Sequence, residues 1–204
     1  MEAGLTRQRA TAVPRMRSVL RGGSDGNLRL TGLTAAVLLV LLAAEGATIP
    51  FIRPLLTAHI FIGVVLIPPV LLKVASTGWR FARYYLGAPE YVAKGPPHNF
   101  HRLLVAPLTV AATAVLFGTG VLLLVLHPQR GLVLGLHKVS FFVWFWAMSA
   151  HVLGHVLKIP GLARADLDRA LPGSGLRQFA VAAAIVAGLV VALATLPLAH
   201  DWTS

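Results

Sequence analysis

The chain has 204 residues, of which 56% are hydrophobic and only 12% are charged, and its mean hydropathy is +0.75. Soluble globular domains are about a quarter charged, so this composition excludes an ordinary soluble domain. There is no cysteine, which excludes disulfides, iron–sulfur clusters and thiolate chemistry. The formal net charge of +11 is of the kind found in nucleic-acid-binding proteins, but the placement of the charges favours another explanation.

Apolar runs of about 20 residues can cross a bilayer as helices. An arginine- and glycine-containing segment comes first, and we expect residues 1–29 to be a disordered basic cytoplasmic tail. The predicted transmembrane domain covers residues 30–199, with spans at about 33–49, 55–75, 103–126, 132–157 and 179–198, and residues 200–204 form a short outer tail. The sequence therefore predicts an all-α integral membrane bundle of five helices.

Local signals refine three of these spans. Pro68 and Pro69 interrupt the second apolar run, and we expect a kink there because proline lacks a backbone donor. Asn99 is the predicted cap of the third span. In the last span, the small residues Ala184, Gly188 and Ala192 recur every fourth position, which permits close approach of another helix. Residues 76–102 and 158–177 are predicted to be basic loops.

The basic residues are distributed unequally between the two sides of this bundle. Fifteen of the 18 Lys and Arg lie on the side of the N-terminal tail, and only Arg53, Arg130 and Lys138 lie on the other. Loops that carry Lys and Arg stay in the cytoplasm, so we expect the N-terminus inside and the C-terminus outside a cell membrane. The charge is thus explained by a lipid bilayer as partner, and nucleic acid is not required.

Histidines within the predicted spans are the main functional signal. His137 and His151 are fourteen residues apart, which in a helix is about 21 Å of rise and within about 40° of one face. His59 lies at the same predicted depth as His137, because both spans run from outside to inside. Ionisable residues within a membrane are costly and mark functional sites by default. Two histidines at equal depth on facing helices can ligate a b-type haem from both sides.

Small residues near these two histidines could let a porphyrin approach the backbone; they are Gly63, Gly135 and Ser140. The alternative is that each histidine makes a hydrogen bond between helices or lines a polar cavity. Glu45, near the outer end of the first span, could pair with Arg53 or could handle protons.

A second, inner site is less complete. Lys73 stands at the depth of His151, where a further histidine would complete a second ligand pair. His151 and His155 are candidate ligands on the fourth span, and His101 is a candidate at the membrane boundary. Lys73 could ligate the iron, could pair with a haem propionate, or could extend its ammonium to the inner interface. As a different possibility, the spacing of His151 and His155 suits a divalent metal ion.

Residues 55–157 resemble the superfamily of small membrane-bound di-haem b-type cytochromes. These proteins are four-helix bundles with histidine pairs about fourteen apart on two helices, and they act as electron-transfer subunits or ferric reductases. The resemblance implies haem ligation by His59, His137 and His151, and Lys73 departs from it. The stretch LIPPVLLKVASTGWRFARYY is also similar to actinobacterial membrane proteins, a similarity that implies no function.

Two functions follow from these observations. The first is a membrane cytochrome with one or two haem b groups that passes electrons between a quinol and a partner oxidoreductase. The sequence shows no nucleophile with a base, no paired carboxylates and no phosphate loop, so any chemistry would belong to the cofactor. The second is a haem-free membrane protein: a scaffold, an assembly factor, or a metal-binding or transport protein.

Overall fold

The computed structural model describes residues 22–95, 101–126, 131–167, 172–200 and 202. Five long helices dominate this part of the chain: α1 (Gly23–Thr48), α2 (Leu56–Tyr85), α4 (Ala106–Leu126), α5 (Gly131–Leu153) and α7 (Ser174–His200). Each lies within a helical segment that is long and apolar enough to cross a membrane, and no strand occurs among the described residues. The predicted all-α bundle with five spans is therefore confirmed, and it indicates a multi-pass membrane protein.

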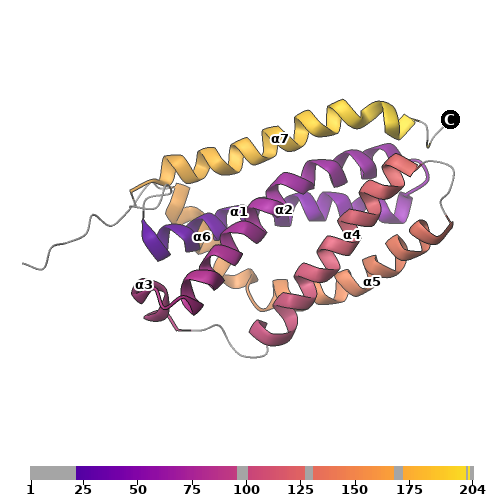
Figure 1. Cartoon of the computed structure of the whole chain (residues 1–204). Helices are drawn as coiled ribbons and strands as arrows, with labels where there is room; N and C mark the ends of the chain where they lie inside the picture. Colours follow the sequence, from indigo (N-terminus) through magenta and orange to yellow (C-terminus); the bar gives the residue numbers. More distant parts are fainter. Residues whose placement is uncertain (1–21, 96–100, 127–130, 168–171, 201, 203–204) are drawn as a thin grey trace, which may run out of the picture.

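Five short elements connect the long helices. They are η1 (Ile49–Phe51), α3 (Pro89–Val92), the π-helical turn η2 (His101–Val105), η3 (Val156–Lys158) and α6 (Ile159–Leu167). In Figure 1, α3 and α6 lie at the same end of the bundle, which is also where α1 and α7 begin. The two ends of the bundle thus differ, because α3 and α6 lie at one of them and η1, which links α1 to α2, lies at the other.

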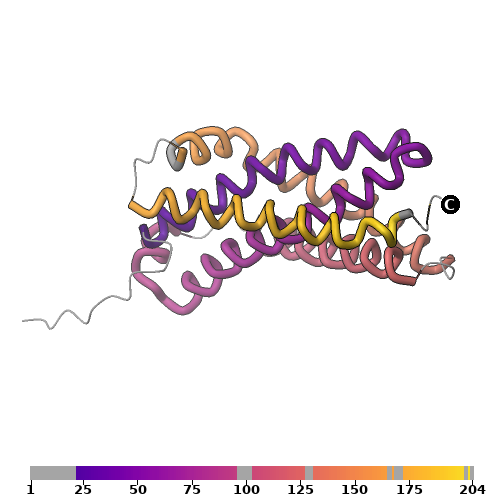
Figure 2. Tube along the Cα trace, turned by 90° about the horizontal axis from the view of Figure 1, so that it is seen from above, coloured from indigo at the N-terminus to yellow at the C-terminus, as the bar shows by residue number. Residues whose placement is uncertain are grey.

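The long helices form two groups (Figures 1 and 2). Helices α1 and α2 are an antiparallel pair, and α7 packs along α2. Helices α4 and α5 form a second hairpin, which meets the first group mainly through the contact of α4 with α2. One buried apolar cluster joins α2, α4 and α7; its members are Val64, Val65, Leu124 and Ala192. The hairpin α4–α5 is therefore attached to the rest of the molecule by a narrow interface.

Small residues allow α7 to approach α2 closely, as predicted. A Cβ atom added to Gly188 would overlap the backbone oxygen of Val65 and would lie 3.1 Å from its Cα and carbonyl carbon. One turn further, Ala192 is only 1% exposed. Because membrane helices associate largely through close van der Waals packing, this contact is the tightest constraint on the position of α7.

The first helix begins earlier than predicted. Residues 23–29 were expected in the disordered tail, but they form the first two turns of α1. In these turns Asp25 forms an ion pair with Lys94, and Ser24 and Asn27 are buried. A polar start is compatible with this helix because other segments cover it. Residues 1–21 lie outside the described part of the chain.

Two other predicted boundaries are wrong because segments that were expected to be loops are helical. Helix α2 continues to Tyr85 through what was expected to be a loop, and it contains Pro68 and Pro69 without a break in the helix. Within the other predicted loop, residues 159–167 form α6, which packs against α1. Gly32 of α1 makes room for it, since a Cβ there would lie 2.5 Å from Leu162 Cβ.

The fourth predicted span is too long at its end. Helix α5 ends at Leu153, and Gly154 and His155 form a turn. His155 therefore does not share a helix with His151. The predicted cap Asn99 lies outside the described residues.

Candidate functional site

His59 lies in the first turn of α2 and faces the end of α1. Its Nδ1 atom is 3.0 Å from Glu45 Oε1 and 2.8 Å from Thr48 Oγ1. The side chains of His59 and Glu45 are 22% and 15% exposed, so the contact is largely shielded. The predicted pairing of Glu45 with Arg53 is wrong, because the carboxylate turns toward the imidazole instead.

The hydrogen bonds around His59 assign its tautomer. The hydroxyl of Thr48 donates to the backbone oxygen of Glu45 at 2.6 Å, so its oxygen is left to accept from the imidazole. The carboxylate oxygen Oε1 of Glu45 can accept from Nδ1–H as well. Both neighbours of Nδ1 are thus acceptors, which places the proton of the neutral ring on Nδ1 and the lone pair on Nε2.

His137 of α5 has an equivalent arrangement with α4. Its Nδ1 atom lies 3.0 Å from Thr119 Oγ1. The Thr119 hydroxyl is itself directed to backbone oxygens of its own helix, those of Val115 at 2.8 Å and Leu116 at 3.0 Å. The Thr119 oxygen is therefore an acceptor for His137, and this ring too carries its proton on Nδ1. Gly120 lies beside the ring, where a Cβ would be 3.3 Å from Cε1.

His59 and His137 belong to two different helices, α2 and α5. His59 and His137 are close enough to interact electrostatically. The side-chain contacts of both rings are made through Nδ1, and His137 also interacts with the backbone oxygen of Leu116. Histidines that bind metals usually donate Nδ1–H to an oxygen acceptor and coordinate through Nε2. The donor chemistry of this pair therefore fits axial ligation of a haem iron.

Glu45 has a second feature of interest. Its other carboxylate oxygen, Oε2, is buried and has no hydrogen-bond partner among the described residues. Gly63 of α2 faces the same carboxylate, since a Cβ there would lie 3.3 Å from Oε1. The sequence suggested that Gly63 leaves space for a porphyrin, but the structure shows that it leaves space for Glu45.

Lys73 points toward α1. Its ammonium donates to the backbone oxygen of Thr31 in α1, at 2.9 Å. The Thr31 hydroxyl lies 3.1 Å from Ser76 Oγ and 3.2 Å from Asn27 Oδ1, so a polar cluster joins α1 to α2 here. Sequence reasoning missed this cluster because Asn27 was placed in the tail.

The remaining candidate residues lie around the end of α5. The rings of His151 and His155 stack with centroids 4.9 Å apart, and His155 Nδ1 is 3.1 Å from the backbone oxygen of His151. Among the described residues, no three or more His, Asp or Glu side chains gather in a group that could hold a metal ion. His101 begins η2, and its side chain lies outside the described part.

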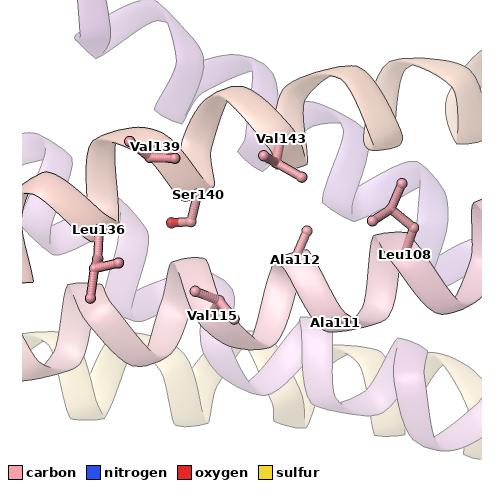
Figure 3. A pocket seen from close by; sticks show the side chains of 8 residues that line it. All are labelled: Leu108, Ala111, Ala112, Val115, Leu136, Val139, Ser140 and Val143. Carbon is pink, nitrogen blue, oxygen red and sulfur yellow. The ribbon is translucent and has the colours of Figure 1, made fainter.

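An apolar cavity of about 280 Å³ lies between α4 and α5 (Figure 3). Its walls are Leu108, Ala111, Ala112 and Val115 from α4, and Leu136, Val139, Ser140 and Val143 from α5. Ser140 is the one polar wall residue, and its hydroxyl donates to the backbone oxygen of His137 at 3.0 Å. Neither His59 nor His137 lines the cavity. The cavity is therefore separate from the histidine pair, and its walls are mostly apolar.

Comparison of the chain with protein-family models, with curated proteins and with solved structures gave no match. The assignment of function therefore depends on the site itself.

Proposed function

We propose that the protein is a membrane b-type cytochrome in which His59 and His137 ligate one haem through their Nε2 atoms. The observation that supports this is shared by both residues: each Nδ1 atom lies within hydrogen-bond distance of an oxygen acceptor, at 2.8 Å for His59 and 3.0 Å for His137. A bis-histidine haem needs two neutral imidazoles in this tautomer, on different helices.

The haem, when bound, supplies one-electron transfer. The chain's own residues hold the ligands: Glu45 and Thr48 fix the ring of His59, and Thr119 fixes that of His137. Small membrane cytochromes of this kind carry electrons between a quinol and a partner oxidoreductase. We propose this role for the protein in the cell membrane, with its N-terminus in the cytoplasm.

We propose one haem and not two. Lys73 is engaged by α1, so α2 offers no second ligand at the depth of His151. His155 lies beyond the end of α5 and stacks on His151, so the two rings do not project as a pair from one helix face. These contacts favour the site of His59 and His137 as the single haem site.

The direct test is an absorption spectrum of detergent-purified protein, oxidised and dithionite-reduced, after expression with haem supplied. We expect a reduced α-band of b-type haem and, in a pyridine haemochrome assay, about one haem per chain. His59→Ala and His137→Ala should each abolish the band while the protein still elutes as a single folded species. A colourless wild-type protein would refute the proposal.

A haem-free scaffold is the second candidate, and one observation favours it. His59 links α2 to α1 and His137 links α5 to α4, so both histidines also act as hydrogen bonds between helices. In a scaffold, His→Ala variants would lower the thermal midpoint of a colourless protein. In a cytochrome, the same variants would remove the absorbance band.

A further inference from the structure

We infer that Glu45 is a positioning residue for His59: its carboxylate holds the imidazole by Nδ1–H and makes the midpoint potential of the site more negative. This inference rests on the proposed function, because it treats His59 as a haem ligand. It assigns a role to a carboxylate that has no other partner in the described structure.

The contacts among His59, Glu45 and Thr48 form a closed ring at the last turn of α1. His59 Nδ1 lies 3.0 Å from Glu45 Oε1 and 2.8 Å from Thr48 Oγ1, and the Thr48 hydroxyl donates back to the Glu45 backbone oxygen. The ring is thus held by two acceptors that are themselves tied together. Rotation of the imidazole about its Cβ–Cγ bond would break both hydrogen bonds at once.

The two proposed ligands differ in the charge of their acceptors. His137 is held by the neutral hydroxyl of Thr119, whereas His59 is held by a carboxylate as well as a hydroxyl. A carboxylate that accepts from Nδ1–H raises the basicity of Nε2, and its charge favours the ferric over the ferrous iron. The two ligands therefore differ in their acceptors, and the residue that shifts the midpoint potential, Glu45, belongs to α1.

The surroundings of Glu45 direct the electrostatic effect of its carboxylate to His59. Oε2 is buried without a partner in the described residues, and Gly63 of α2, which also faces the carboxylate, has no side chain to compete. Electrostatic interactions in such a shielded location are stronger than in water. No other ion pair of Glu45 occurs in the described part of the chain.

The test compares the midpoint potential of the haem-loaded wild type with those of Glu45→Gln, Glu45→Asp and Glu45→Ala. We expect Glu45→Gln to shift the potential to a more positive value, because the amide keeps the shape and removes the charge. Glu45→Asp, which keeps the carboxylate, should lie nearer the wild type than Glu45→Ala. The matched control is Glu90→Gln, which removes an exposed carboxylate on α3 and should leave the potential unchanged.

Two outcomes would overturn the inference. One is an unchanged potential in Glu45→Gln at full haem content. The other is loss of haem from Glu45→Asp to the same extent as from Glu45→Ala, since the carboxylate would then not be the cause.

A readout independent of haem separates this inference from the proposed function. In haem-free protein, ¹⁵N NMR of the His59 imidazole should report the Nδ1–H tautomer in the wild type and a mixture of tautomers in Glu45→Ala. If the wild type never binds haem, the proposed function fails, and the NMR result still decides whether Glu45 holds the ring. An Nε2–H tautomer in the wild type would contradict the positioning role.

Discussion

Lys73 of α2 and Thr31 of α1 are joined by a hydrogen bond from the ammonium to the backbone oxygen, with the two atoms 2.9 Å apart. Ser76, one turn later on α2, bonds back to the oxygen of Lys73 and lies against the Thr31 hydroxyl. A charged residue within a predicted span is thus satisfied inside the first helix pair.

This contact predicts that Lys73→Met leaves the haem content of the protein unchanged. The backbone oxygen of Thr31 remains within α1, and hydrogen bonds between membrane helices contribute only about 0.6 kcal/mol on average. We therefore also expect a small change in the thermal midpoint. The measurement is a pyridine haemochrome assay per mole of protein. A fall of the haem content by half would show that Lys73 serves a haem site.

The close approach of α7 to α2 predicts that Gly188→Ala is destabilising. The added Cβ would overlap the oxygen of Val65, and overpacking of this kind costs about 1–3 kcal/mol. Thermal unfolding in detergent should show the lower midpoint. The matched control is Gly118→Ala in α4, where a Cβ meets nothing within 4 Å. There, alanine should be neutral or stabilising by up to about 1 kcal/mol, because it favours helix over the unfolded chain.

The acceptor of His137 predicts that Thr119→Val weakens haem binding. Valine has a similar shape but cannot accept from Nδ1–H, so the ring loses the contact that fixes its tautomer. Loss of such a supporting contact typically lowers metal affinity by about 10- to 100-fold. Haem retention during dilution is the measurement. Thr195→Val is the control, since Thr195 bonds only to the backbone of α7; equal losses in both variants would contradict the prediction.

The turn after α5 predicts that His151→Ala and His155→Ala each leave the reduced α-band at full intensity. Their rings stack on one another at the end of the helix, away from the turn of α5 that carries His137. Absorption spectra of the two purified variants, normalised to protein, would check this. Loss of about half the absorbance in either variant would establish a second haem and refute the single-site proposal.

The five spans were predictable because each is a long apolar run, and a bilayer requires little more than length and hydropathy. Their ends were not, because they depend on partners from distant segments. Asp25 pairs with Lys94, so α1 begins within a polar stretch. Leu162 packs over Gly32, so a segment expected to be a loop is the helix α6.

The candidate site was predictable in part. His59 and His137 stand out as ionisable residues in apolar runs. Their equal predicted depth in the membrane follows from the common direction of the second and fourth spans. Their acceptors do not stand out, because Thr48 and Thr119 resemble any other hydroxyl residue of a membrane helix. Glu45 was recognised as unusual, with Arg53 as a possible partner or a proton-handling role, but its contact with His59 was not predicted.

The division of the helices into two groups has a consequence for biogenesis. One hairpin, α1–α2, carries His59, and the other, α4–α5, carries His137. The two meet mainly where α4 contacts α2. A nascent chain whose first hairpin has inserted therefore offers a single imidazole, and the pair exists only after the second hairpin has docked. Under the proposed function, formation of the haem site therefore follows the docking of the two hairpins.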